Sequence, residues 1–305
     1  ALAALTGRKF DLVLTMLHLA DTDARDLGRA IKQRDPDLPV VHLRHQADVS
    51  SASELEAPKP PGTDRMFVWS GNTDLLVSLI KSAEDRLNVG HDTSSAGIRV
   101  ILFVEDSPIY ISSLLPLLYK EVVSQTQAVL EEGLNEEHRL LTMRARPKIL
   151  VAEDYEEAQH LYETYQPYIL GVISDVRYPR NGRLDDSAGV DFLTRIKRER
   201  FDIPLLLTSS DASNAERAAG IPASFVHKHS PSLHEEVHAF FRDHLGFGDF
   251  VFRRPTGEEI ARASTLRRLE NLMAEIPEDS FVAHCNRNDF SRWLFARTEI
   301  MLASK

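Results

Sequence analysis

Acidic side chains follow two apolar segments that have the length and composition of buried strands. Glu105 and Asp106 come directly after the run 100–104, and Asp175 follows the run 169–174. Apolar runs of this length that alternate with helical patterns predict a parallel sheet, in which all strands end at one edge. The three carboxylates should therefore lie together, where they repel one another unless a cation is present. Oxygen ligands of this kind suit Mg²⁺, which we predict as the cofactor.

Hydroxyl and ammonium groups follow the next two apolar runs. Thr208 and Ser209 end the run that begins at Ile203, and Lys228 follows the run 224–227. A carboxylate, a divalent cation, a hydroxyl and an ammonium can together take up a phosphoryl group, because the positive charges neutralise its oxygens while the carboxylate attacks. Each residue alone also fits a structural role, such as a turn, a helix cap or a solvated charge. Their joint placement on four strand ends favours the functional interpretation.

The segment 98–245 has the alternation of elements that would position such a site. Helical patterns separate five short apolar runs, which are 100–104, 148–152, 169–174, 203–207 and 224–227. Right-handed connections between parallel strands then give an α/β, flavodoxin-like, doubly wound sheet of five strands. In this fold the functional residues lie at the carboxyl ends of the strands.

Residues 1–89 repeat part of the same alternation. Their apolar runs are 11–16, 38–43 and 67–69, and a helical pattern extends from about Thr73 to Asn88. We interpret this segment as a second, incomplete copy that lacks the first two strands of the repeat. A sheet without those strands exposes an apolar edge, so we expect another segment to cover it.

Residues 98–245 resemble the receiver domains of response regulators. The resemblance rests on the acidic pair at Glu105, on the acceptor segment 174–179 with its proline four residues after Asp175, and on the strand 203–209. The segment 220–228 completes the pattern with a lysine at its end. Counting from the proline of the strand 203–209 favours Ser209 over Thr208 as the hydroxyl of the site.

The resemblance implies a role for each residue of the site. Asp175 would accept the phosphoryl group from a sensor histidine kinase or a phosphotransfer protein. Mg²⁺ would be held by Asp106, Asp175 and the backbone carbonyl of Arg177, with Glu105 on a metal-bound water. Lys228 and the hydroxyl of Ser209 or Thr208 would bind the phosphoryl oxygens, and Phe225 would be the switch aromatic.

The first copy lacks these chemical groups at the corresponding positions. Met16 stands where the acceptor aspartate would be, Arg44 where the hydroxyl would be, and Ser70 where the lysine would be. Methionine cannot take a phosphoryl group, and without carboxylates no metal is held. We interpret residues 1–89 as a degenerate receiver that serves docking or dimer contacts.

The receiver-like segment departs from the family pattern in two places. The loop after Asp175 is longer than usual, and it reaches the glycine that resembles the family's loop glycine only at Gly189. An insertion, 107–147, replaces a single short helix; we expect a long helix up to Gly133 and a second one capped by Asn135. The insertion could support a homodimer.

Residues 90–97 read as a linker, and residues 247–305 as a separate, mostly helical module. We expect one helix over 265–275 with Ser264 as its cap, and another over 290–303, with Phe290, Trp293 and Leu294 packed inward. This module is similar to a segment of bacterial proteins that fuse receiver-like domains to a phosphoenolpyruvate synthase or pyruvate phosphate dikinase-type region.

Composition limits the other classes of function. The formal net charge is −10 and there is one cysteine, Cys285, so we expect no nucleic-acid partner, no disulfide and no cysteine-based zinc site. A secretory signal and a membrane-spanning run are not recognised, so we expect a cytoplasmic protein without a membrane partner. His234 and His238 fit a zinc-protease spacing literally, but we predict that they hold no metal.

Two functions remain open. The first is a two-component response regulator whose only catalysis is its own phosphorylation and dephosphorylation. The second is an unphosphorylated docking or dimerisation scaffold that regulates a phosphoenolpyruvate synthase or pyruvate phosphate dikinase-type enzyme. A DNA-binding output is a third option that the charge disfavours.

Overall fold

The structure, a computed structural model, describes residues 2–16, 24–46, 59–132 and 145–305 of the chain. It divides into two compact units. The first consists of residues 1–86 and 107–116, and the second consists of residues 87–106 and 117–305. Each unit contains a parallel sheet.

The first unit contains a three-stranded sheet in the order β1-β2-β3. Its strands are β1 (Val13–Met16), β2 (Val40–His45) and β3 (Arg65–Trp69), and both neighbouring pairs are parallel. The short helix α1 (Ala4–Gly7) precedes the sheet, and α2 (Ala24–Arg34) connects β1 to β2. The predicted strands are confirmed, whereas the interpretation of this unit as a second receiver stays a prediction.

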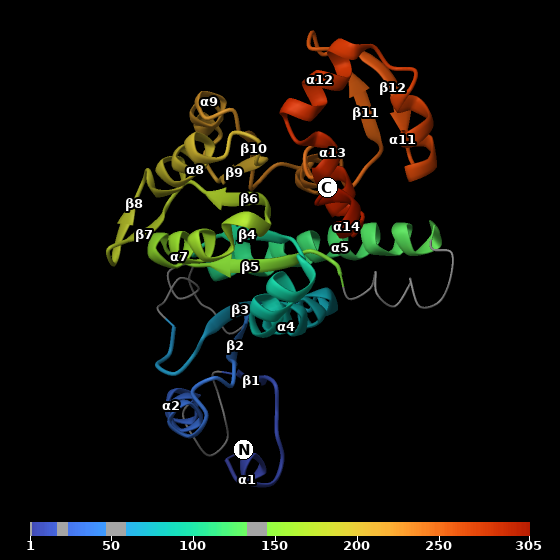
Figure 1. Cartoon of the computed structure of the whole chain (residues 1–305). Coiled ribbons are helices and arrows are strands. Elements are labelled where there is room, and N and C mark those ends of the chain that lie inside the picture. The colour runs from blue at the N-terminus through green and yellow to red at the C-terminus, as the bar shows by residue number, and fades with distance from the viewer. Residues whose placement is uncertain (1, 17–23, 47–58, 133–144) are drawn as a thin grey trace. The chain divides into compact units, whose positions relative to one another are not determined.

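The second unit contains the predicted five-stranded sheet, in the order β5-β4-β6-β9-β10 with every neighbouring pair parallel (Figure 1). The strands are β4 (Val100–Val104), β5 (Lys148–Ala152), β6 (Ile169–Asp175), β9 (Leu205–Ser209) and β10 (Ser224–His227). In order of sequence this is the arrangement 2-1-3-4-5 of the flavodoxin-like fold. The doubly wound α/β fold class is therefore confirmed for this unit.

Helices cover the five-stranded sheet on both faces. One core cluster joins the strands to α7 (Tyr155–Tyr165), α8 (Ala188–Glu199) and the region of α9 (Ala215–Gly220). The helices α5 (Pro108–Glu132) and α10 (Leu233–Asp243) lie beside each other, since Glu121 of α5 contacts His238 of α10. Edge-to-face aromatic contacts of Phe192 in α8 with Tyr155 and Tyr162 in α7 hold these two helices together.

The local sequence explains where several of these helices begin. The carboxylate of Asp154 accepts a hydrogen bond from the backbone N–H of Glu157, and the Glu157 carboxylate accepts one from the N–H of Glu153. These bonds satisfy backbone donors that the first turn of α7 leaves without helical partners. The helix therefore begins at Tyr155, with only Glu153 and Asp154 between it and the end of β5.

The long loop after Asp175 is a hairpin, which the sequence analysis did not identify. Strands β7 (Tyr178–Arg180) and β8 (Arg183–Asp185) pair antiparallel. The two residues between them, Asn181 and Gly182, both have positive φ angles. An Asn-Gly pair favours this conformation because both residues tolerate it, and it matches the twist of the two strands. The Asn-Gly pair was the sequence signal for this hairpin.

The predicted helix end at Asn88 is wrong, because α4 (Thr73–Ala96) continues through the predicted linker 90–97. Hydroxyl groups of the last turns donate to carbonyls one turn earlier, as Thr93 does to Val89 and Ser95 does to His91. The helix ends at Gly97, whose φ of +66° is the left-handed conformation that commonly terminates helices. The polar residues and the glycine of the segment 90–96 therefore do not end the helix.

The long helix at the start of the insertion is confirmed, since α5 extends to Glu132. The predicted second helix, from Asn135 to Pro147, falls largely outside the described residues. In the described part of the chain, no helix is both long enough and apolar enough to cross a membrane.

The C-terminal segment contains helices and an antiparallel hairpin, which the sequence analysis missed. The hairpin consists of β11 (Phe250–Arg253) and β12 (Glu259–Ala263). The helices are α11 (Leu266–Met273), α12 (Glu278–Asn286), α13 (Asp289–Ala296) and α14 (Ile300–Ala303).

Two predicted details of this segment are wrong. The cap of α11 is Thr265 rather than Ser264, because the Thr265 hydroxyl accepts the N–H of Arg268 at 3.2 Å. The predicted single helix over 290–303 is two helices, because Thr298 has a φ of +63° that interrupts the helical backbone.

The predicted inward packing in this segment is confirmed. Trp293 and Leu294 are buried in a cluster that contains Phe250 and Phe252. Phe290 is partly buried and stacks on the ring of Phe250, with the ring centroids 4.7 Å apart. These contacts hold α13 against the β11–β12 hairpin.

Candidate phosphoryl-acceptor site

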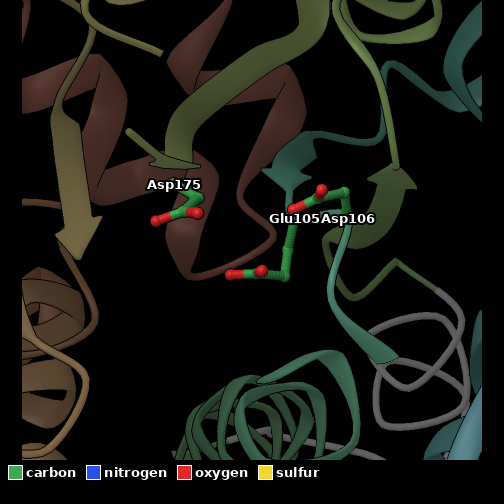
Figure 2. Close-up of side chains that lie close together, drawn as sticks. All are labelled: Glu105, Asp106 and Asp175. Carbon is green, nitrogen blue, oxygen red and sulfur yellow. The ribbon is translucent and has the colours of Figure 1, made fainter. Parts of the chain in front are cut away.

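The structure brings Glu105, Asp106 and Asp175 together at the carboxyl ends of β4 and β6 (Figure 2). One carboxylate oxygen from each residue lies within 4.8 Å of the others. Glu105 and Asp175 are buried, and Asp106 is half-buried. The convergence expected from the parallel sheet is therefore present.

Backbone contacts explain how these ends come to meet. The N–H of Glu105 donates to the carbonyl of Ala152 at 2.9 Å, which continues the pairing of β4 with β5 beyond the strand. Gly189, at the start of α8, donates its N–H to the carbonyl of Val176. A Cβ atom at Gly189 would lie only 1.8 Å from the carbonyl oxygen of Asp175. The helix can approach the acceptor strand this closely because position 189 has no side chain.

Lys228 extends from the end of β10 into the carboxylate group. Its ammonium lies 2.6 Å from Oε2 of Glu105 and 2.9 Å from Oδ1 of Asp175. Its backbone N–H donates to the carbonyl of Ser209, so the lysine and the hydroxyl residue are fixed to each other through the main chain. Burial alone would lower the pKa of Lys228, but the charges of Glu105 and Asp175 raise it above its usual value. The lysine is therefore charged at neutral pH.

The carboxylates remain electrostatically unfavourable despite this lysine. Burial raises the pKa of Glu105, against the charge of Lys228, and the charge of Asp175 raises it further. Burial and the charge of Asp175 raise the pKa of Asp106 to about 6. When all four side chains are ionised, three carboxylates and one ammonium leave a net charge of −2. One divalent cation balances that charge.

The side chains present fit a magnesium ion. In the described part of the chain, this is the one group of three or more carboxylate, imidazole or thiol side chains that lie close enough together to hold a metal. All its donors are carboxylate oxygens, which Mg²⁺ prefers over nitrogen and sulfur. Arg177, whose carbonyl is the fourth predicted ligand, follows Asp175 by two residues. The side chain of Arg177 is exposed and lies 3.8 Å from Asp186.

The two candidate hydroxyl groups differ in what they bind. Thr208 is buried, and its hydroxyl lies 3.4 Å from the carbonyl of Ser174 on the neighbouring strand. The hydroxyl of Ser209 accepts hydrogen bonds from the N–H of Asp211 and from the side chain of Asn214, each at 3.0 Å. Since both bonds use lone pairs of Ser209, its own proton remains to be donated to a phosphoryl oxygen. This favours Ser209.

Asn214 was not identified from the sequence, although it holds the Ser209 hydroxyl. In the sequence, the run 210–214 reads only as a helix cap. Residue types there do not distinguish a residue that caps a helix from one that orients a hydroxyl group. Phe225, the predicted switch aromatic, is partly buried and packs against the core that includes α8. Its movement on phosphorylation stays a prediction.

The corresponding positions of the first unit hold no comparable group. Met16 ends β1 and is 46% exposed, Arg44 is buried within β2, and Ser70 is exposed after β3. Among the residues described in this unit, no carboxylates gather at the ends of the strands. A degenerate site is consistent with this arrangement.

One of the two histidines on α10 that have the zinc-protease spacing, His238, contacts a neighbouring helix. Nδ1 of His238 lies 2.8 Å from Oε2 of Glu121 on α5. Within the described residues, His234 and His238 belong to no cluster of metal-binding side chains. His238 thus links α10 to α5.

Comparisons with known proteins return receiver domains at low similarity. No protein-family model matches the chain, and no curated protein matches it. A solved response regulator receiver domain from Clostridium thermocellum is 17% identical, with a TM-score of 0.32 over 46% of this chain and 90% of that one. A probable two-component response regulator with a GGDEF domain is also 17% identical, with a TM-score of 0.28 over 76% of this chain and 78% of that one. At these scores the fold assignment rests on the strand order and pairing described above.

Proposed function

We propose that this chain is a response regulator of a two-component system, in which Asp175 accepts a phosphoryl group in a reaction that depends on Mg²⁺. The observation that carries this proposal is the position of Lys228 among three carboxylates at the carboxyl ends of a 2-1-3-4-5 parallel sheet. A purely structural ion pair needs one carboxylate for one lysine. The two extra carboxylates raise the free energy of the fold unless a cation joins them.

The chemistry follows from these side chains. A carboxylate oxygen of Asp175 attacks the phosphorus of a phosphohistidine donor, so that the P–N bond breaks as the P–O bond forms. The electron pair of the P–N bond stays on the imidazole of the donor, which takes up a proton. When bound, Mg²⁺ would neutralise phosphoryl oxygens, held by Asp106 and Asp175 with the Arg177 carbonyl and with Glu105 through water. Lys228, already 2.9 Å from Asp175, would transfer its contact to the new phosphoryl group.

The output would come from the groups that surround the new charge. A phosphoryl group adds a charge of about −1.5 to −2 and strong acceptor oxygens. Ser209 would turn its hydroxyl proton toward these oxygens, while Asn214 and the N–H of Asp211 hold its oxygen in place. Phe225 lies three residues before Lys228 on β10, so a movement of Lys228 is transmitted along that strand. The surface of β10 and α10 would then change.

The test is to incubate the protein with Mg²⁺ and a small phosphodonor and to measure its intact mass. We expect the wild type to gain one phosphoryl group and the Asp175→Asn variant to gain none. Asp186→Asn, which removes an exposed carboxylate of the same loop, is the matched control and should be phosphorylated normally. No gain in the wild type, or an equal gain in Asp175→Asn, would refute the proposal.

The alternative function is a scaffold that regulates a phosphoenolpyruvate synthase or pyruvate phosphate dikinase-type enzyme without being phosphorylated. Such a scaffold would bind its partner equally well with and without the phosphodonor, and equally well as the Asp175→Asn variant. The response-regulator proposal expects partner binding to change when Asp175 is phosphorylated.

A further inference from the structure

A second charged site lies at the opposite ends of β9 and β10 from the carboxylates. A cleft with a volume of about 600 Å³ is lined there by the residues that begin these strands, by the ends of α8 and α10, and by β11, α12 and α13. This volume is in the range of clefts that hold small molecules. The whole cleft belongs to the second unit.

Basic side chains from three places in the second unit converge on this cleft. They are Lys197 of α8, Arg292 of α13 and His244, which follows α10. The ammonium of Lys197 donates to the carbonyl of Ile203 at 3.2 Å, and no carboxylate of the described residues lies within ion-pair distance of it. Lys197 thus brings a positive charge without an ion-pair partner among the described residues to the cleft, in a chain whose formal net charge is −10.

The positive groups disfavour one another's charge. Burial lowers the pKa of Lys197, and the charge of Arg292 lowers it further, against the attraction of Asp202. Burial likewise lowers the pKa of Arg292, against the carboxylates of Asp289 and Asp202. For His244, desolvation lowers the pKa and the charges of Arg292 and Lys197 add to this effect, against Asp243. A bound anion would relieve this repulsion.

The carboxylates that line the cleft interact mainly with arginines, and one of them, Asp289, is bonded to Arg292 of the cluster. Asp243 receives both side-chain bonds of Arg242 at 2.7 Å, and Asp202 receives two bonds of Arg200 at 3.1 Å. Asp289 is shared among His284, Arg287 and Arg292. The fourth, Asp249, is exposed and attracts Arg262. Asp202 attracts Lys197, but none of the four lies within ion-pair distance of its ammonium.

We propose that this cleft binds a small molecule that carries a phosphate group, with Lys197, His244 and Arg292 as the groups that contact the phosphate. Phosphate suits the site because it offers several acceptor oxygens and up to two negative charges to donors that come from different directions. Phe201, which is 62% exposed and lines the same cleft, offers a flat apolar surface to a ring of the ligand. The proposal does not depend on the phosphorylation of Asp175.

The ligand would connect two parts of the second unit. Lys197 and His244 belong to the layers around the five-stranded sheet, whereas Arg292 belongs to the C-terminal segment. Arg292 already donates to the carbonyl of Asp202 at 2.9 Å, and Asn288 lies 3.2 Å from its carboxylate. A phosphate held by all three basic side chains would add a contact between the same two parts.

Calorimetric titration of the full chain with inorganic pyrophosphate and with AMP, in EDTA, tests the proposal. EDTA removes divalent cations, so binding cannot occur through a metal on the carboxylates. We expect at least one of the two anions to bind, and Lys197→Met to weaken that binding by about tenfold or more. Lys120→Met removes an exposed lysine of α5 and should bind like the wild type. If AMP binds, Phe201→Ala should weaken AMP binding and leave pyrophosphate binding unchanged.

A measurement of stability separates ligand binding from a structural role of Lys197. Because the pKa of Lys197 is lowered in the fold, its charge disfavours the folded state at neutral pH. Lys197→Met should therefore melt no lower than the wild type without ligand, and Lys197→Arg should retain binding. Failure of both anions to bind the wild type overturns the proposal. Unchanged affinity in Lys197→Met, equal weakening by Lys120→Met, or loss of binding in Lys197→Arg also overturns it.

Discussion

The two parallel sheets of this protein are built in the same way but end in different chemistry. Both form from short apolar runs, and in both all the strands point in one direction. The strands of the five-stranded sheet end in Glu105, Asp175 and Lys228, whereas the corresponding ends in the three-stranded sheet are Met16 and Ser70. The difference shows that apolar runs establish the scaffold, while a few residues beyond them decide its chemistry.

The sheets also differ in how completely they are buried. Every residue of β4, β5, β6 and β9 is buried, whereas β1 has two strongly exposed apolar side chains, Leu14 and Met16. At the strand ends of the five-stranded sheet, charged groups are held in low-dielectric surroundings, where their pKa values shift and their interactions are strong. A substitution at the strand ends should therefore have large effects in one sheet and small effects in the other.

The largest expected effect concerns phosphorylation. In an Asp175→Asn background, introducing an aspartate by Met16→Asp should not restore any phosphoryl uptake, because the described residues of the first unit place no cluster of carboxylates around that position and Ser70 stands where the lysine would be. Intact mass after incubation with Mg²⁺ and a phosphodonor measures this. A mass gain in the double variant would show that the two sheets are chemically closer than their strand ends indicate.

The next largest effect is a difference in Mg²⁺ affinity between variants of the two sheets. Asp106→Asn removes a carboxylate that would contact the cation and should weaken Mg²⁺ binding by about 100-fold or more, since loss of even an outer contact costs about 10- to 100-fold. Asp37→Asn, an exposed position of the first unit, should leave the affinity unchanged. Calorimetric titration with Mg²⁺ measures both, and equal affinities in the two variants would contradict the assignment of the site.

A glycine substitution should show how tightly the acceptor strand is packed. Gly189→Ala would place a Cβ atom 1.8 Å from the Asp175 carbonyl oxygen, so we expect a loss of about 3 kcal/mol or more in the free energy of unfolding. In the first unit, Gly28→Ala meets the backbone of Gly62 at 3.1 Å and should cost less. Gly220→Ala meets nothing within 4 Å and should change stability by no more than about 1 kcal/mol. Denaturant unfolding measures all three, and similar losses would contradict this order.

The smallest expected effect is the pH dependence of the metal-free protein. The pKa of Asp106 is raised to about 6, so its stabilising contribution is present below its ordinary pKa of 3.8 and is lost as the pH rises through about 6. In EDTA the melting temperature of the second unit should therefore fall over this range. Asp106→Asn should flatten the fall, and Asp186→Asn should not. Mg²⁺ should reverse the fall above pH 6, where the carboxylate is ionised and can bind the cation.

Much of the site could be predicted because it depends on short segments. Glu105, Asp175 and Lys228 each follow an apolar run directly, and parallel pairing necessarily brings the ends of such runs to one edge. The choice between Thr208 and Ser209 depended on more than position. Only the structure showed that Asn214 and the N–H of Asp211 hold the Ser209 hydroxyl.

Errors arose where hydrogen bonds within one helical turn, which residue type alone does not reveal, decided where a helix continues or ends. The polar segment 90–97 contains glycine, serine and threonine, which are common in linkers, but in α4 the hydroxyl groups bond within the helix. The run 290–303 has a continuous helical pattern, yet its helix stops at Thr298. There the N–H groups of 297–299 bond carbonyls of 293–295, which closes α13 before α14 begins.

The sequence by itself determined the parallel sheet, its strand ends and the carboxylates that gather there, because apolar periodicity and strand direction act over a few residues. The tertiary structure alone decided how Lys228 divides its charge between Glu105 and Asp175, and how Lys197, His244 and Arg292 come to share a cleft. These groups are far apart along the chain and meet only through packing. Burial then sets the pKa values of these groups and the strength of their interactions, and burial is a property of the whole fold.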